Sequence, residues 1–442
     1  MSKPNRVPMR FAALACGLAG WLANAAAHDQ IPGGPQTKPI AIVGGTVHTV
    51  DGAVLPVATV VFENGLITAV GKNAKPPAGA TVIDAKGQHV YPGMIESMSD
   101  IGLREISAVD VTVDGTERGS ENPNVQALSA VNPDSELIPV ARANGVLMAM
   151  TAPGGRWMRG QSAVIQLDGW DARQMTLRSP AGLVVDWGSM HPSDSDAKRR
   201  AIKREEKLQQ LDDLLDSVRR YADARIAQPE QTPTDLRLES LIPVVRGELP
   251  LYAVANDQEP IESAVAYAQQ QGLQLVIYGG YDAVECAPLL KRFDVPVIIA
   301  SIYRLPRHRN DPYDASYTLP SRLLAAGVRF CIAGEGAGYP GGASNARNLP
   351  YHAATAVAYG LSREAALRAV TLSAAEILGV ADRVGSLTPG KHATLFVATG
   401  DILETESNVT SAFIQGRVVD LNSRHTLLNQ KYQEKARQLG SQ

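Results

Sequence analysis

Acidic and amide side chains that follow apolar runs are the residues best placed to do chemistry. Glu96 and Asp100 lie in one short strand pattern after a Pro-Gly turn, and because alternate residues of a strand share a face, both side chains should point the same way. Asp100, Asn256 and Glu335 are expected to converge at one end of a barrel. An oxygen-only cluster suits Mg²⁺, Ca²⁺ or Mn²⁺ better than Zn²⁺. The alternative, which we favour, is that these groups form hydrogen bonds that close a site without a metal.

The elements that would position these residues are short apolar runs separated by helical patterns. The runs expected to be strands buried on both faces are 146–150, 251–254, 273–278, 295–300 and 328–333. The helical patterns between the last four are 261–271, 283–293 and 317–326. Repeated βα units imply a parallel sheet, so we predict an α/β fold with a (β/α)8 TIM-like barrel over residues 93–380. A doubly wound sheet also fits the pattern.

Segments rich in β-branched residues flank this region on both sides. Residues 40–50 and 59–70 are two such runs, and Asn64-Gly65 is the strongest hairpin signal in the chain. A further β-rich region follows the barrel. Each short β segment alone would leave an open edge, so residues 38–92 and 381–422 are predicted to form one composite β-sandwich. Residues 423–442 are predicted to form a helical tail.

The first residues have the pattern of a secretory signal peptide. Basic residues precede an almost wholly apolar stretch over 11–22, and small residues follow it, so we expect cleavage of residues 1–27 and export to the periplasm or the medium. An uncleaved anchor is the alternative. Cys286 and Cys331 would remain in the mature chain, and both are predicted to be buried free thiols.

Composition limits the classes of partner. The 442 residues carry a net charge of −3, and the pI is near 6.3. These values give no electrostatic reason to expect nucleic acid or an anionic membrane surface as a partner. Residues 196–226 are densely charged, but apolar residues recur there at helical spacing, which predicts one long surface helix.

Two segments resemble the amidohydrolase superfamily. VYPGMIESMSDIGL, residues 90–103, resembles the start of that family's barrel, and RVGSLTPGKHATLFVA, residues 383–398, resembles its C-terminal signature. Other segments, in their order, resemble the branch related to imidazolonepropionase and exported peptidase-like enzymes. The resemblance implies a (β/α)8 barrel with a composite β-sandwich, and metal-dependent hydrolysis of C–N bonds other than ordinary peptide bonds.

The residues that hold the family's metal are replaced in this chain. The paired histidines after the first strand correspond to Met98 and Asp100, and the histidines after the fifth and sixth strands correspond to Val254 and Gly279. The aspartate after the eighth strand corresponds to Glu335, and no carbamylated lysine could be located. The eight histidines show no HxH or HExxH spacing. We therefore predict a degenerate metal site without a bound cofactor.

The resemblance leaves two functions open. One is a catalytically impaired or inactive homologue that binds a small molecule or peptide, as a homo-oligomer or in a hetero-oligomer with an active amidohydrolase. The other is an active hydrolase of small peptides or cyclic amides with an altered acidic or metal site. In either case the candidate catalytic residues are Glu335 and Asp100. The candidate substrate-binding residues are Asn256, Tyr281, His308 and Arg347.

Overall fold

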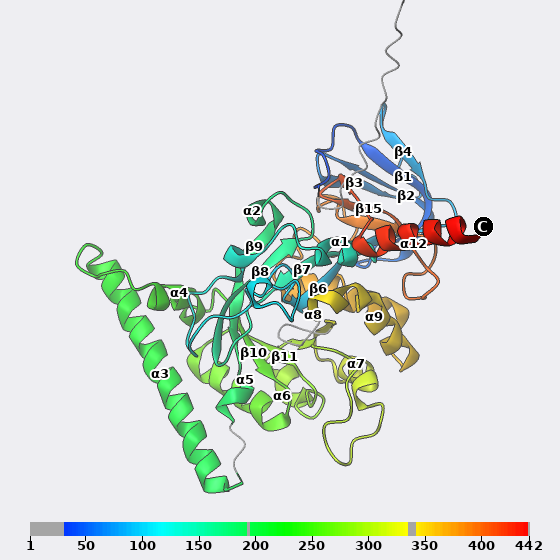
Figure 1. The fold of residues 1–442 in the computed structure, drawn as a ribbon. Coiled ribbons are helices and arrows are strands. Elements are labelled where there is room, and N and C mark those ends of the chain that lie inside the picture. Colours follow the sequence, from blue (N-terminus) through cyan, green and yellow to red (C-terminus); the bar gives the residue numbers. More distant parts are fainter. Residues whose placement is uncertain (1–30, 192–194, 335–341, 441–442) are drawn as a thin grey trace, which may run out of the picture.

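An eight-stranded sheet that curls into a nearly closed barrel forms the centre of the molecule (Figure 1). The computed structural model describes residues 31–191, 195–334 and 342–440, so Glu335 and the expected signal peptide lie outside the described residues. The strands follow the order β13-β12-β11-β10-β9-β8-β7-β6. At the closing seam, the Cys331 thiol of β13 donates to Ser97 Oγ of β6 at 3.3 Å. The strand bounds are β6 Met94–Ser99, β7 Val146–Thr151, β8 Met158–Gln166, β9 Thr176–Val185, β10 Leu251–Ala255, β11 Leu275–Gly279, β12 Val297–Ile299 and β13 Phe330–Ile332.

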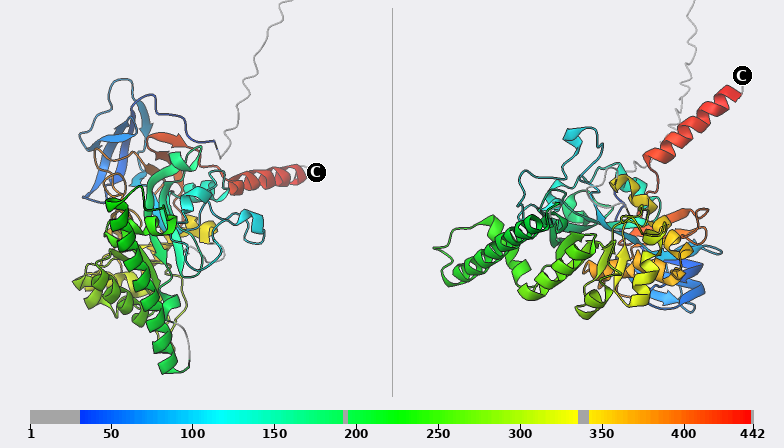
Figure 2. Two further views of the ribbon diagram at one scale, coloured as in Figure 1. Left: turned by 90° about the vertical axis from the view of Figure 1, so that its left-hand side faces the viewer. Right: turned by 90° about the horizontal axis from the view of Figure 1, so that it is seen from below.

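Helices cover the outer face of this sheet (Figures 1 and 2). Because side chains alternate along each strand, Ile277 and Ile299 pack outward against the helices, while Tyr278 and Ile298 belong to the interior cluster. The helices are α1 Leu137–Arg142, α2 Ala172–Met175, α3 Ala197–Ala227, α4 Leu236–Val245, α5 Gln258–Gln271, α6 Ala287–Arg292, α7 Ala315–Ala326, α8 Gly342–Asn345, α9 Leu349–Ala358, α10 Arg363–Ala369 and α11 Leu372–Ile377.

One strand of the barrel does not follow the predicted parallel pattern. β8 runs antiparallel to both β7 and β9, whereas the other neighbouring pairs are parallel. Only residues 152–157 connect β7 to β8. A parallel crossover needs a dozen or more residues, so this connection allows only a hairpin. The barrel is TIM-like, but at β8 it departs from the strand-then-helix repetition of the predicted (β/α)8 barrel.

Strands from both ends of the chain share the second sheet. Its path is β16-β15-β14-β5-β1-β2-β3, and β4 pairs with β1. β14 lies antiparallel to β5, and Phe62 and Phe413 pack edge to face with ring centroids 5.1 Å apart. The strands form one sheet here, so the two-layer sandwich stays a prediction. The bounds are β1 Ile40–His48, β2 Val54–Glu63, β3 Leu66–Gly71, β4 Thr81–Asp84, β5 His89–Pro92, β14 Leu395–Ala398, β15 Val409–Ile414 and β16 Arg417–Val419.

The predicted hairpin is present between β2 and β3. Asn64 and Gly65 form its two-residue turn with φ values of 52° and 79°. Both angles are left-handed, as a type I′ turn requires, and Asn-Gly is the pair best suited to that backbone. The local sequence therefore determines this turn.

Two helices extend away from the rest of the molecule (Figure 2). α3 buries Leu211, Leu215 and Val218, but Ile202 near its start is 58% exposed. The C-terminal helix α12, Arg424–Gly440, buries no residue. Among the described residues, no helix is both long and apolar enough to span a membrane. Cys286 and Cys331 are buried and free, as predicted.

A buried ion-pair cluster joins the barrel to the composite sheet. Asp168, which follows β8, lies 3.1 Å from Arg142 of α1 and 3.1 Å from Arg417 of β16. The side chains of Asp168 and Arg142 are 0% and 3% exposed. Arg142 and Arg417 therefore share the carboxylate of Asp168, and the pair of Asp168 with Arg142 is almost fully shielded from water.

We expect Asp168→Asn to lower the free energy of unfolding by about 3–5 kcal/mol, because it leaves the buried Arg142 and the half-buried Arg417 without their shared carboxylate. Urea denaturation measures the change. Asp294→Asn is the matched control, because Asp294 pairs with Arg329 on the surface, where such pairs contribute about 1 kcal/mol or less. A loss for Asp168→Asn no larger than the control's would contradict this prediction.

Candidate functional site

The C-terminal ends of β10, β11 and β12 bring most of the predicted binding residues to one face of the barrel. Asn256 follows β10, Tyr281 follows β11, and His308 lies in the loop after β12. Ligands of barrel proteins bind at this face because the loops after the strands converge there. Arg347 is placed elsewhere: its carbonyl accepts from Asn144, which precedes β7, and its guanidinium lies 3.2 Å from His425 of the C-terminal segment.

Tyr281 holds the loop after β12 in place. Its hydroxyl donates to Asp311 at 2.7 Å and accepts from the backbone N–H of Arg307 at 3.1 Å. The backbone N–H groups of Arg307 and His308 also donate to Asp311. The phenol hydroxyl is thus occupied by contacts within the protein, and the sequence prediction that it binds substrate remains untested.

Glu96 and Asp100 are both buried, and each is held by backbone groups from the far side of the barrel seam. Both carboxylate oxygens of Glu96 accept from the N–H of Gly334, at 3.0 and 2.9 Å. Asp100 accepts from Arg104 at 2.9 Å and from the N–H of Ala343 at 3.0 Å. Burial raises the pKa of Glu96 to about 8, so this carboxyl is largely protonated at neutral pH.

Burial also raises the pKa of Asp100, and the nearby Arg104 guanidinium opposes that shift. Because Asp100 already has an arginine and a backbone partner, its carboxylate is committed to contacts inside the protein. This arrangement agrees with the hydrogen-bonding interpretation favoured from the sequence. Its expected partner Glu335 lies in the segment that is not described, so the predicted pair of catalytic carboxylates is not tested.

The two apolar positions that the sequence resemblance assigns to metal ligands face the barrel interior. Met98 is 1% exposed and belongs to the interior cluster with Met148, Tyr252 and Tyr278. Val254 is half-buried and packs against the same cluster. Neither side chain offers a nitrogen or oxygen to a metal ion.

Gly279 has no room for a side chain. Its φ is 113°, in the region that favours glycine, and an added Cβ would lie 2.6 Å from Asn256 Oδ1 and 2.8 Å from the carbonyl oxygen of Ala255. Asn256 Oδ1 in turn accepts from Arg304 at 2.8 Å. An amide and a guanidinium therefore occupy the region into which a histidine at position 279 would project.

Charged side chains surround the phenol of Tyr278 in the same part of the barrel. Burial raises the pKa of Tyr278, Arg304 and Arg159 lower it, and Glu96 and Asp100 raise it. Arg159 pairs with Asp186 at 2.7 Å. Glu96, Asp100, Arg159 and Arg304 thus each influence the phenol of Tyr278.

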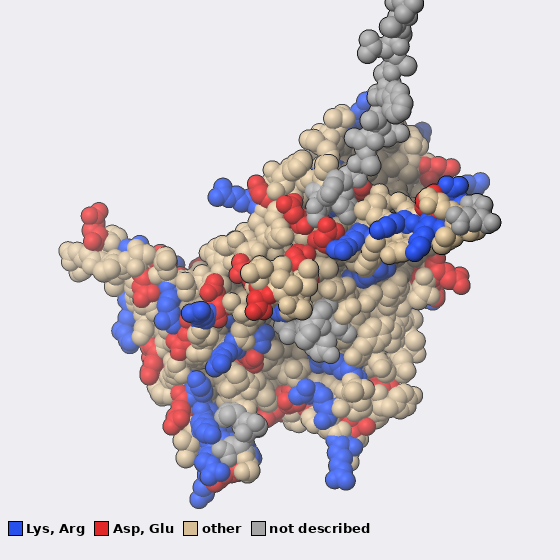
Figure 3. Space-filling model, in the orientation of Figure 1, with Lys and Arg blue, Asp and Glu red and all other residues tan. Residues whose placement is uncertain are grey.

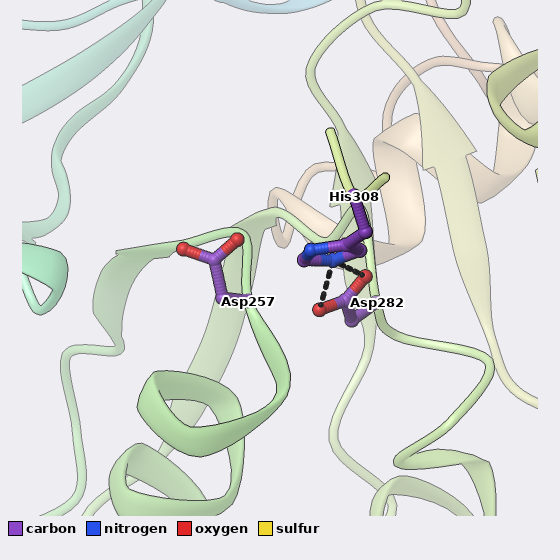
Figure 4. A group of neighbouring side chains, drawn as sticks. All are labelled: Asp257, Asp282 and His308. Carbon is purple, nitrogen blue, oxygen red and sulfur yellow. Dashed lines mark hydrogen bonds and ion pairs between the residues drawn. The ribbon is translucent and has the colours of Figure 1, made fainter. Parts of the chain in front are cut away.

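A second group of possible metal ligands lies on the rim of this face. Asp257, Asp282 and His308 each offer one ligand atom within 4.8 Å of the others (Figure 4). His308 Nε2 lies 2.9 Å from Asp282, whose carboxylate raises the pKa of the imidazole. Arg307 binds Asp257 through both carboxylate oxygens, at 2.7 and 3.0 Å. The donor types suit a divalent cation, but Arg307 would have to release Asp257 first.

Tyr278, Arg304, Asp257 and Asp282 are not among the residues predicted from the sequence. Each lies at the end of a predicted strand or in the loop that follows it, which is the position that marks functional residues in a parallel barrel. Acidic and basic side chains are otherwise mixed over the face of the molecule shown in Figure 3.

Comparisons with known proteins agree on one superfamily. The model of the Amidohydrolase family matches residues 317–419. Amidohydrolase tasK of Hapsidospora irregularis is 23% identical over 392 residues, which is 81% of this chain and 39% of tasK. The chain therefore spans well under half of that relative.

The solved structures extend this agreement to the fold. An amidohydrolase from Thermotoga maritima MSB8 is 27% identical with a TM-score of 0.75, over 86% of this chain and 99% of that one. A prolidase complexed with N-methylphosphonate-L-proline is 16% identical with a TM-score of 0.53, over 87% and 100% of the two chains, and supports the fold alone. The findings together support membership of the amidohydrolase superfamily.

Proposed function

We propose that this protein binds a small ligand at the C-terminal face of its barrel and does not hydrolyse it through the metal centre of the amidohydrolase superfamily. The observation that carries the proposal is the backbone at Gly279, which leaves no space for a histidine. Met98 and Val254 add two apolar side chains where nitrogen ligands would be needed. The residues at these positions therefore do not fit a zinc ion.

The contribution that a zinc ion would make to catalysis is larger than that of its obvious substitute, a carboxylate base, which supports the same proposal. A zinc ion lowers the pKa of its bound water from 15.7 to about 7, which corresponds to about 12 kcal/mol in the availability of hydroxide. A carboxylate acting alone as a general base contributes about 3–5 kcal/mol. Glu96 is a weak candidate for that role, because its raised pKa leaves little carboxylate at neutral pH.

A second candidate function is hydrolysis with a metal at Asp257, Asp282 and His308. The observation in its favour is that one imidazole and two carboxylates lie close together at the face where barrel enzymes act. The bidentate contact from Arg307 to Asp257 disfavours it. Elemental analysis of the purified protein, repeated with His308→Ala, separates the two candidates, because only the second requires a metal that this substitution removes.

The double variant Met98→His, Asp100→His tests the proposed function. We expect no turnover of dipeptides, cyclic amides or ureides above the level of the unmodified protein, because catalytic zinc usually needs three protein ligands and the opposite wall would still lack them. Asp100→His also removes the carboxylate that Arg104 and Ala343 contact. The variant's melting temperature must therefore be measured beside its activity and zinc content.

Unmodified protein with about one tightly held zinc per chain and measurable turnover would contradict the proposal. So would a folded double variant that gained clear zinc-dependent activity. A folded variant that binds zinc weakly without turnover is the expected result.

The location, the family branch and the partner of the protein are inferred from the sequence and belong to this proposal. We infer an exported protein of the imidazolonepropionase-related branch, whose partner could be a second copy or an active amidohydrolase. The name of tasK describes an amidohydrolase, and the match covers 39% of that relative. Co-purification with an active superfamily member from the same cells would support the hetero-oligomer.

A further inference from the structure

Arg304 carries the inference that the observations support furthest. It follows β12, and its guanidinium donates to Asn256 Oδ1 at 2.8 Å, directly beside Gly279. We propose that Arg304 supplies the positive charge of this site in place of a metal ion and binds the carboxylate of a small monoanionic ligand. This inference rests on the proposed function, because it names the class of ligand for the same face of the barrel.

Among the described residues, Arg307, Arg159 and Arg104 of this face pair with carboxylates, whereas Arg304 does not. Arg307 pairs with Asp257 at 2.7 Å, Arg159 with Asp186 at 2.7 Å, and Arg104 with Asp100 at 2.9 Å. In the part of the chain that the structure describes, the hydrogen-bond partner of Arg304 is the neutral amide of Asn256. A half-buried guanidinium without a counter-charge favours an anion from solution.

The burial of Arg304 and the groups around it strengthen the expectation that it binds an anion. Burial is the main cause that lowers its pKa, and Arg307 adds to the effect, while the opposing groups are the phenols of Tyr278 and Tyr281. Neither phenol ionises near neutral pH, so neither compensates the charge. The loop that carries Arg304 is held by the contacts of Tyr281 and Asp311, which fixes the guanidinium before a ligand arrives.

Arg304 carries one positive charge, so a ligand with one negative charge matches it. Among the described residues, three other arginines of this face, Arg307, Arg159 and Arg104, already pair with carboxylates. A carboxylate matches this charge and the planar fork of a guanidinium. A phosphate dianion would bring an extra charge close to Asp257 and Asp282. We therefore expect a small carboxylate, with the amide of Asn256 and the phenol of Tyr278 available to its polar groups.

Binding of N-acetylglycine and of its neutral analogue N-acetylglycinamide, measured by calorimetry at pH 7 and constant ionic strength, tests the proposal. We expect the acid to bind at least about tenfold more tightly than the amide, because only the acid forms a charge-assisted pair. Arg304→Met should remove this preference. Arg307→Met is the matched control and should retain it, because that arginine is already paired.

Several results would overturn the assignment: absence of acid binding by the unmodified protein, equal binding of acid and amide, a preference unchanged in Arg304→Met, or inorganic phosphate binding more tightly than the acid. Zinc-dependent turnover with the acid preference intact would refute only the proposed function. Equal binding of acid and amide by the unmodified protein, without zinc-dependent turnover, would refute only the role of Arg304.

Stability without ligand gives a second measurement. Arg304→Met should leave the melting temperature unchanged or raise it, because it removes a desolvated charge whose hydrogen-bond partner among the described residues is a neutral amide. Arg159→Met should lower it by a few degrees, because Asp186 loses its 2.7 Å partner. A loss for Arg304→Met as large as that for Arg159→Met would show that Arg304 already has an anionic partner in the protein, and would refute the proposal.

Discussion

Removal of residues 385–442 is expected to abolish cooperative folding. The deletion takes away β14, β15 and β16, which leaves the β5 edge of the composite sheet unpaired. It also removes Leu395, Val397 and Phe413 from the core that they share with the N-terminal strands. Loss of one buried aromatic side chain alone costs about 3–5 kcal/mol, which is a large part of the stability of a typical domain.

Circular dichroism and size-exclusion chromatography of the truncated chain measure this outcome. Deletion of residues 424–442 is the matched control, because α12 buries no residue and its removal should leave the melting temperature nearly unchanged. A monodisperse product of the longer deletion that melts cooperatively would show that the N-terminal strands form a stable unit by themselves.

Glu96→Gln is expected to stabilise the protein by an amount that increases with pH. The pKa of Glu96 is about 8 in the folded protein, against 4.5 for an ordinary glutamate. Below pH 4.5 both states are protonated and the carboxyl contributes no pH dependence. Between pH 4.5 and 8 the unfolded chain loses the proton and the folded protein retains it, so the stability of the unmodified protein falls by about 1.4 kcal/mol per pH unit.

The full difference between unmodified protein and Glu96→Gln is on the order of 5 kcal/mol above pH 8, and it disappears toward pH 4.5. Urea denaturation of both proteins from pH 5 to pH 9 measures it. Glutamine keeps an oxygen that can accept from Gly334, so the substitution removes the titration rather than the hydrogen bond. Glu63→Gln, at an exposed position, should change stability little at any pH. A difference for Glu96→Gln that does not vary with pH would show that Glu96 ionises normally.

Local sequence was sufficient to predict the elements whose geometry depends on residues that are neighbours in the chain. Asn64-Gly65 predicted its turn because few other pairs adopt two left-handed residues in succession. The apolar stripe predicted the long helix, which is observed as α3 over Ala197–Ala227. The β-rich segments at the two ends were predicted to join, and β5 and β14 pair as that prediction required.

Tertiary structure decided which way β8 runs and what occupies the site. Only a few residues separate β7 from β8 in the sequence. This short connection predicts an antiparallel β8 only if Met158–Gln166 is recognised as a separate strand. Arg347 was grouped with the binding residues because its loop follows the last barrel strand, and the folded chain turns it toward Asn144 and His425. Loops of this length can return along the outside of a barrel, so position in the chain does not predict where their side chains lie.

From the sequence, histidines are predicted to be absent from the four positions that the resemblance assigns to the superfamily's metal site, because residue identities are read without coordinates. Only the tertiary structure decided what replaces them. The left-handed backbone of Gly279, the amide of Asn256 and the guanidinium of Arg304 come from three separate loops or strand ends. Charge compensation depends on distances between atoms far apart in the chain, since Coulomb energy falls with separation in space and not with separation in sequence.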